Sequence, residues 1–372
     1  MSKNKATNVY RDPVLGKELI EAILRQADIF QEKFGRKANL MEVCGTHTVS
    51  VSKAGLREVF RDKIELISGP GCPVCVTSHE DIDYMIELGK QQNVILCTFG
   101  DMMRVPGSDS SLAEEKANGH DIRVLYSPLE ALDIAEENLD KKVIFLAVGF
   151  ETTTPAIAAT IDMAEQRGIE NYYVFTAHKI CPPVVKLLFQ DPNLKVDGLL
   201  LPGHVAAIVG RKALDFIATE YHVPSSIAGF EPLDVLAGMF DILRMLNKGE
   251  AAVTNQYLRV VKEEGNIPAQ EMLEKYFQAT DSNWRGIGNI PGSGLELRDP
   301  YKKYDARTLF DIKVSATVKT KGCRCGEVLS GYIKPTECGH FGKSCTPVSP
   351  VGPCMVSYEG TCATYYKYER KV

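Results

Sequence analysis

The sequence predicts an α/β protein with two similar parallel-sheet lobes and a loop-rich C-terminal domain. Up to residue 262, short apolar runs alternate with segments of helical periodicity, which indicates βαβ units and parallel sheets. The apolar runs are continuous, as is typical of strands in sheets that are covered on both faces. From residue 323 onward the helical periodicity is lost, and Cys, Gly and Pro dominate. The 372 residues, 44% of them hydrophobic and 24% charged, suit a globular protein of two or three domains.

Capping residues and apolar periods predict four helices. The first begins behind Asp12 with Pro13 in its first turn, and its apolar residues keep a helical period as far as Phe34. The other three begin near Thr77, at Pro155 and at Pro232, and end at Gly89, at Gly168 and near Gly249. Buried strands are predicted at 39–44, 63–68, 93–99, 122–127, 141–150, 172–177 and 196–201.

The order of these elements divides the chain into three parts. A first lobe is predicted over 36–140, a second over 141–262, and a loop-rich domain over 263–372, with residues 1–35 as a candidate addition to that third domain. The Gly-rich, polar stretch within the third part, residues 282–306, is expected to be an extended loop.

Charge and hydropathy exclude several classes of protein. The net charge of -5 argues against a nucleic-acid binder, which usually carries a basic excess. No apolar run approaches the roughly 18 residues of a membrane span, and the N-terminal residues lack the apolar core of a secretory signal. We therefore expect a cytoplasmic protein. Eleven cysteines in such a chain indicate metal binding or thiol redox chemistry.

Six of the cysteines lie in the last 50 residues, in the frame C-x-C-x12-C-x6-C-x8-C-x7-C. Structural zinc sites usually present two C-x2–4-C pairs, which this frame lacks, and six thiolates exceed one zinc site. A [4Fe–4S] cluster takes four thiolates and would leave two over. A cluster is therefore the preferred prediction, with zinc and purely structural thiols as the alternatives.

The N-terminal cysteines follow predicted strands. Cys72 and Cys75 form a C-x-x-C before a predicted helix, whose positive end favours a thiolate, so a redox pair is preferred over half of a zinc site. Cys44 and His47, three residues apart, could share a metal or act as nucleophile and base. Asp101 follows another strand. Because ligands of parallel α/β sheets bind at the carboxyl ends of strands, we expect Cys44, Cys72, Cys75 and Asp101 to converge.

These motifs together resemble the HypD family of hydrogenase maturation factors. They occur in the family's order between residues 41 and 362, nearly the whole chain. One departure is that Thr46 and Thr48 stand where family members often have a glycine and a second histidine. The motifs are MEVCGTHT, GPGCPVC, TFGDMMRVPGS, GFETTTP, LPGHV and the six-cysteine tail.

The resemblance implies a scaffold or maturase with redox-active thiols rather than a conventional turnover enzyme. Such a protein, monomeric on its own, assembles the Fe(CN)₂CO group of [NiFe]-hydrogenase together with a HypC-like chaperone. A HypE-like protein, with a HypF-like partner upstream, supplies the cyanide. Cys44 would then bind the iron under assembly, and the thiol pairs and a [4Fe–4S] cluster would supply electrons.

The C-x-C pair is also similar to that of ferredoxin:thioredoxin reductase, in which one member binds the cluster and its neighbour enters a redox disulfide. That similarity implies that Cys325 and Cys354 form the redox disulfide, and it favours an alternative function as a cluster-dependent protein-disulfide reductase, which would not need Cys44. A third hypothesis is a passive metal protein that only binds partners. The cluster ligands implied by the similarity are Cys323, Cys338, Cys345 and Cys362.

Overall fold

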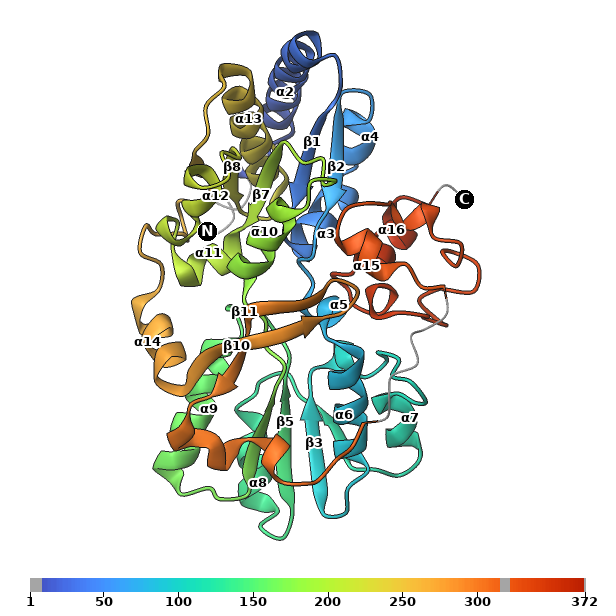
Figure 1. Cartoon of the computed structure of the whole chain (residues 1–372), viewed down its shortest axis with the longest axis vertical. Helices are drawn as coiled ribbons and strands as arrows, with labels where there is room; N and C mark the ends of the chain where they lie inside the picture. The colour runs from blue at the N-terminus through green and yellow to red at the C-terminus, as the bar shows by residue number, and fades with distance from the viewer. Residues whose placement is uncertain (1–8, 315–321, 371–372) are drawn as a thin grey trace, which may run out of the picture.

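The computed structural model describes residues 9–314 and 322–370. Two α/β lobes lie one above the other, a β-hairpin crosses between them, and the C-terminal segment packs at one side (Figure 1). Both large sheets are wholly parallel, which confirms the predicted α/β class with two parallel-sheet lobes.

The first lobe is built on a five-stranded sheet of order β2-β1-β7-β8-β9. Met41 lies in an interior strand and pairs with Ile67 of one neighbouring strand and with Leu199 of the other. The strands are β1 (Ala38–Glu42), β2 (Ile64–Ser68), β7 (Gly198–Pro202), β8 (Ser225–Ala228) and β9 (Val253–Asn255).

The second lobe is built on a four-stranded sheet of order β4-β3-β5-β6. All five residues of β3 are buried, as expected for a strand with both faces covered. The strands are β3 (Val94–Thr98), β4 (Ile122–Val124), β5 (Lys142–Ala147) and β6 (Tyr172–Thr176).

The pairing of these strands differs from the predicted division at residue 140. That boundary separates β3 from β5, yet Ile95 of β3 pairs with Val143 of β5 in one sheet. Likewise β7, which was expected in the second lobe, pairs with β1. The chain therefore leaves the first lobe after β2 and returns to it at β7. Both lobes use similar strand–helix units, so the apolar pattern does not show which sheet a strand joins.

Helices of the first lobe cover its sheet. The predicted N-terminal helix is α2, capped by Asp12, which accepts hydrogen bonds from the N–H groups of Val14 and Leu15. It packs on α13 and β1 rather than on the C-terminal domain, so the suggested grouping of 1–35 with that domain is wrong for the described part. The helices are α2 (Pro13–Phe34), α3 (Gly45–Lys53), α4 (Leu56–Phe60), α11 (Gly203–Val209), η2 (Lys212–Leu214), α12 (Phe216–Thr219) and α13 (Pro232–Lys248).

Most of the remaining helices before the hairpin follow the strands of the second lobe or lead into them, whereas the last one follows β9 and leads into the hairpin. Predicted boundaries are close to those observed: α6 begins after Ser78, whose hydroxyl accepts from the Asp81 N–H, and α9 ends at Gly168 in the left-handed conformation. These helices are α5 (Pro73–Val76), α6 (His79–Gly89), η1 (Gly100–Met102), α7 (Leu112–Ala117), α8 (Glu130–Glu137), α9 (Thr154–Arg167), α10 (Cys181–Gln190) and α14 (Ile267–Tyr276).

A hairpin replaces most of the extended loop predicted over 282–306. Strands β10 (Phe277–Trp284) and β11 (Gly288–Leu297) pair antiparallel, and Gly286 in their turn has a φ of 76° that a side chain would strain. Trp284 is fully buried and forms an isolated antiparallel β-bridge with Thr77, the residue after α5. The short helices η3 (Asp299–Tyr304) and η4 (Ala306–Thr308) follow. The polar composition concealed these strands because many of their residues face solvent.

The C-terminal domain has few regular elements, as predicted from its composition. Its helices pack on the first lobe through α3 and on α5. They are α15 (Cys325–Leu329), η5 (Pro335–Glu337), η6 (Pro353–Met355) and α16 (Thr361–Tyr368).

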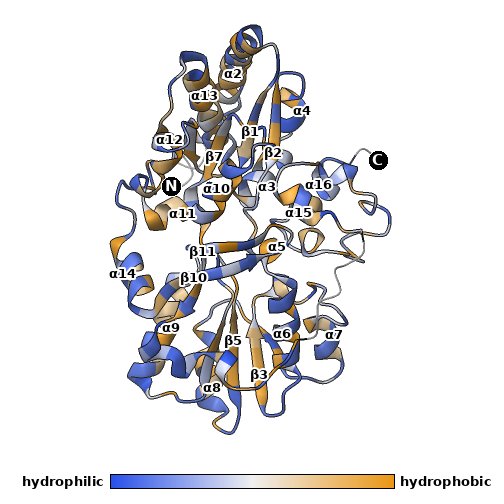
Figure 2. Ribbon diagram, viewed as in Figure 1, coloured by the Kyte–Doolittle hydropathy of each residue, from blue (hydrophilic) through white to orange (hydrophobic). Residues whose placement is uncertain are grey.

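One hydrophobic core runs through both lobes and into the C-terminal domain. It includes Met41 and Leu201 of the first sheet, Leu96 and Leu146 of the second, and Leu329 of α15. Figure 2 shows the strands of the two parallel sheets as largely hydrophobic and β10 of the hairpin as mostly hydrophilic, with helices of mixed hydropathy around them. Among the described residues, no helix combines the length and apolarity needed to cross a bilayer.

A buried ion pair fastens the C-terminal helix to the first lobe. The guanidinium of Arg57 in α4 contacts the Glu42 carboxylate at 2.7 Å, and the two side chains are only 10% and 1% exposed. Arg57 also pairs with Glu369 at 3.0 Å and lies over the ring of Tyr365 in α16. Because the pair is shielded from water, loss of one partner leaves an uncompensated buried charge.

We therefore expect Arg57→Met to lower the free energy of unfolding by about 3–5 kcal/mol, measured by urea titration. Arg61→Met is the matched control, because Arg61 forms an ion pair with Glu58 in which both side chains are more than half exposed. Its loss should cost less than about 1 kcal/mol. Equal losses for the two variants would contradict a special role for the buried pair.

Candidate redox and metal site

Cys44 lies at the carboxyl end of β1, as the N-cap residue of α3. The Gly45 N–H donates to the Gly71 carbonyl at 3.0 Å, which joins this turn to the loop before Cys72. A Cβ atom at Gly71 would lie 2.4 Å from Cys44 Cα. Only glycine permits this approach, so the backbone of the C-x-x-C loop lies directly against Cys44.

Cys72 and Cys75 form a disulfide in this structure. Cys72 is the N-cap of the one-turn helix α5, and its sulfur accepts from the Cys75 N–H at 3.2 Å. The helix beginning near Thr77 was correctly predicted, but α5 intervenes between it and Cys72. Both sulfur-bearing side chains are buried. The pair is therefore in its oxidised form, at the end of β2 and beside Cys44.

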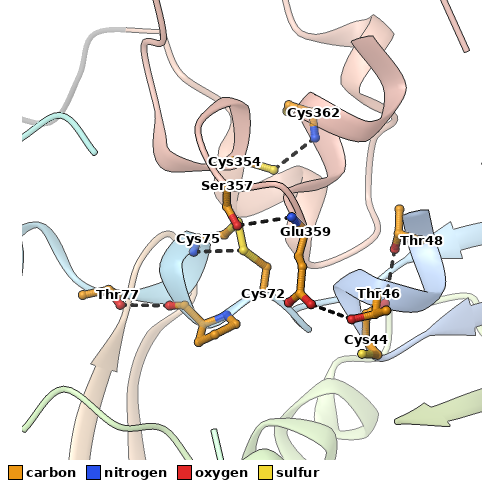
Figure 3. The surroundings of a disulfide bond; sticks show 11 residues. Cys44, Thr46, Thr48, Cys72, Cys75, Thr77, Cys354, Ser357, Glu359 and Cys362 are labelled. Atoms are coloured by element: carbon orange, nitrogen blue, oxygen red, sulfur yellow. Dashed lines mark hydrogen bonds between the residues drawn. A yellow bond between two sulfur atoms is a disulfide. The ribbon is translucent and has the colours of Figure 1, made fainter. Parts of the chain in front are cut away.

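The C-terminal domain contributes a carboxyl group to the same place. The Thr46 hydroxyl donates to Glu359 Oε1 at 2.5 Å, and a Cβ atom at Gly45 would lie 2.5 Å from the Glu359 carbonyl oxygen. Figure 3 shows Glu359 reaching from its loop toward Thr46 and Cys44. Sequence reasoning missed Glu359, which lies among the C-terminal cysteines without a motif of its own.

The Cys44 thiol is held in its protonated form. Burial raises its pKa to about 11, the charge of Glu359 acts in the same direction, and hydrogen bonds from the backbone N–H groups of His47 and Thr46 oppose both. The thiolate is the form that binds metal, so a metal ion must displace this proton.

His47 does not serve as the base expected from its spacing. Its imidazole is fully buried, its Nε2 lies 2.9 Å from the Gly229 carbonyl, and the ring stacks on Phe230. Burial lowers the pKa of His47 to about 4, so the ring is neutral. The His47 group that contacts the Cys44 sulfur is the backbone N–H. The side chain fastens α3 to the segment after β8.

The second lobe faces Cys44 with residues that follow its strands. Asp101 after β3 is exposed, and its charge acts on Glu359. Glu151 after β5 is 3% exposed, and its Oε1 accepts from the Cys181 N–H at 2.8 Å. Burial raises the pKa of Glu151 to about 7. The Cys181 thiol interacts electrostatically with both Glu151 and Cys44, so the carboxyl ends of the two sheets face one another.

The six C-terminal thiols surround one small cavity. Its lining includes Cys323, Cys325, Cys338, Cys345, Cys354 and Cys362, together with Gly352 and Val351. The Val351 N–H donates to Cys345 Sγ at 3.3 Å, and a Cβ atom at Gly352 would lie 2.9 Å from Cys323 Sγ. Backbone donors to sulfur and a glycine cradle suit a bound iron–sulfur cluster.

The six thiols line the same cavity, but their sulfur atoms are not arranged around one common metal position. Among residues 9–314 and 322–370, no three His, Cys, Asp or Glu side chains stand in an arrangement that could hold a metal ion. The side chains suit a cluster of several iron atoms for two reasons: thiolates are soft ligands for iron, and six of them line one cavity. Which four would bind stays a prediction.

Cys325 and Cys354, the implied redox pair, are both buried and joined by a thiol hydrogen bond. That bond, together with burial, raises the pKa of Cys325 well above its usual range. The Cys354 sulfur also accepts from the Cys362 N–H at 3.2 Å. Cys354 lines the cavity, and η6, which carries it, packs against α5 on the side of the Cys72–Cys75 disulfide (Figure 3).

Comparison with known proteins covers nearly the whole chain. The HypD family model, described as "Hydrogenase formation hypA family", matches residues 16–369. The chain belongs to the HypD family. Hydrogenase maturation factor HypD of Rhodobacter capsulatus is 43% identical over 369 residues, 98% of each chain. The proteins of the same name from Escherichia coli K12 and Azotobacter vinelandii are 41% and 39% identical, over 97% and 99% of this chain and 97% of theirs. HypD membership supports an involvement in hydrogenase maturation.

The disulfide of this HypD-family chain is expected to open and close reversibly. Thiol labelling at graded redox potential should titrate Cys72 and Cys75 together as one two-electron couple. Cys97 is the internal control, because it is fully buried within β3 and should stay unlabelled while the protein is folded. Persistent reduction of both cysteines under oxidant, with the fold intact, would contradict a redox role.

Proposed function

We propose that this protein is a scaffold on which the Fe(CN)₂CO group of [NiFe]-hydrogenase is assembled, in a complex with a HypC-like chaperone. The observation that supports this most is the convergence of three segments: the Cys44 turn, the Cys72–Cys75 loop and the C-terminal domain. The proposed iron ligand Cys44, the two-electron couple Cys72–Cys75 and the domain that carries the proposed cluster cavity are therefore adjacent.

Cys44 is the proposed ligand of the iron under assembly, which is cargo rather than a resident cofactor. A thiolate is a soft ligand suited to low-spin iron that carries cyanide and carbonyl. Because burial and Glu359 keep the free thiol protonated, iron binding releases a proton, and empty protein does not expose a reactive thiolate. The HypC-like chaperone supplies a second thiolate.

The Cys72–Cys75 pair is the proposed electron source for cyanide transfer. A HypE-like protein, with a HypF-like partner upstream, presents cyanide as a thiocyanate, R–S–CN. The dithiol form of the pair reduces it, giving R–SH, HCN and the Cys72–Cys75 disulfide. The disulfide in this structure corresponds to the spent form. Two electrons and two protons regenerate the dithiol.

A [4Fe–4S] cluster held by Cys323, Cys338, Cys345 and Cys362 would supply those electrons one at a time. Cys325 and Cys354 are the proposed relay, because Cys354 lines the cavity and belongs to η6, which packs against α5. Gly352 leaves room beside Cys323, and backbone N–H groups of this segment donate to sulfur.

Replacement of the iron ligand separates this proposal from an electron-transfer enzyme. Cys44→Ser should keep the cluster absorbance of anaerobic protein but lose the cyanide and carbonyl infrared bands of its complex with the chaperone. Cys181→Ser is the matched control, since it alters a neighbouring buried thiol that is not assigned to the iron. Full infrared bands in Cys44→Ser would instead favour a cluster-dependent disulfide reductase.

Metal analysis tests the C-terminal domain directly. Anaerobically purified protein should contain about four iron and four sulfide per chain. Cys338→Ser should lose both, whereas Cys97→Ser, which changes a core thiol of the second lobe, should keep them. One zinc per chain without sulfide would refute the cluster.

A further inference from the structure

The turn of the β10–β11 hairpin inserts between the disulfide helix and the C-terminal cysteines. The Arg285 N–H donates to the Val76 carbonyl at the end of α5, at 2.8 Å. On the other side, a Cβ atom at Gly286 would lie 2.4 Å from Gly326 Cα, in the residue that follows Cys325. The hairpin turn therefore contacts both redox elements of the proposed mechanism.

The guanidinium of Arg285 is buried there without a carboxylate partner. The residue is 5% exposed, and within the described parts of the chain no Asp or Glu forms an ion pair with it. One of its terminal N–H groups donates to His79 Nδ1 at 2.9 Å, while Nε has no hydrogen-bond partner. Arginine stays protonated in proteins, so a full positive charge is buried at this place.

The groups that act most strongly on this charge are thiols. Burial lowers the pKa of Arg285, and this shift is opposed most by Cys325, then by Cys323, and less by Asp83. A buried charge without a counter-ion is unfavourable, and it is stabilised by negative charge on its neighbours. The guanidinium in turn favours the anionic form of Cys325, against the hydrogen bond with Cys354 and the burial that raise the pKa of this thiol.

We propose that Arg285 is the fixed counter-charge of the C-terminal sulfur centre and sets the reduction potential of the cluster proposed there. If these thiols hold a cluster, its reduction would add one electron with no bond formed or broken, and the guanidinium that acts on Cys325 and Cys323 would attract the added negative charge. In a shielded environment that attraction is weakly screened, so it favours the reduced form. Arg285 is a positioning residue: it binds no substrate or cluster atom, and its charge raises the reduction potential of the proposed cluster. This role depends on the proposed function.

The test compares reduction potentials measured by dithionite titration with electron paramagnetic resonance on cluster-loaded full-length protein. Arg285→Gln should lower the ratio of reduced to oxidised cluster at least tenfold at a given potential, a shift of about 59 mV for one electron. Arg285→Lys, which keeps the charge, should restore most of it. Arg324→Gln is the matched control: Arg324 lies between Cys323 and Cys325, but it is 40% exposed and paired with Glu327, so the potential should change little.

An Arg285→Gln protein with four iron, four sulfide and an unchanged potential would overturn the inference while leaving the proposed function standing. If Arg285→Gln fails to hold a cluster, Arg285→Lys decides: a near-native potential supports the charge, and a lost cluster or strongly lowered potential overturns it in favour of the specific hydrogen bonds of arginine. Native protein without a cluster would reject both the inference and the proposed role of the domain.

Discussion

The arrangement of the site depends on close backbone contact at two glycines. At Gly71 the C-x-x-C loop lies against Cys44, and at Gly45 the Cys44 turn lies against the loop that carries Glu359. A methyl group at either position would overlap backbone atoms, which side-chain movement cannot relieve. Three segments from distant parts of the sequence can meet there only because neither contact contains a side chain.

Buried charge around this contact has two separate functions. The Arg57–Glu42 pair is neutral overall and contributes to stability, because it joins the first sheet to the last helix. Arg285 and Glu359 are not neutralised in this way, and each acts on a neighbouring thiol. Glu359 disfavours negative charge at Cys44, whereas Arg285 favours it at the C-x-C pair. The two charged groups therefore act in opposite directions, although burial raises the pKa of Cys44 and also contributes to the raised pKa of both thiols of the C-x-C pair.

Much of this could be predicted from local sequence. Continuous apolar runs identified β1 to β7, and caps such as Asp12 identified the long helices, because those signals lie within each element. The assignment of strands to sheets could not be predicted, since it depends on contacts between distant segments. The role of His47 was also hidden: its spacing from Cys44 suggested a base, but the fold turns the ring toward Gly229. Glu359 and Arg285 acquire their roles only through tertiary neighbours.

The interrupted path of the first sheet has a consequence for biosynthesis. β1 lies between β2 and β7, and β7 follows all four strands of the second sheet in the chain. A nascent chain can pair β1 with β2 but leaves the other edge of β1 open until the four strands of the second sheet and then β7 have been made. Such non-local pairing slows folding, and an open apolar edge invites association with other chains. The four strands of the second sheet are continuous in the chain and can pair early, although the core of that lobe also needs later residues such as Phe277 and Leu297. The first sheet, in which Cys44 follows the interior strand β1, is completed only when β7, β8 and β9 have been made.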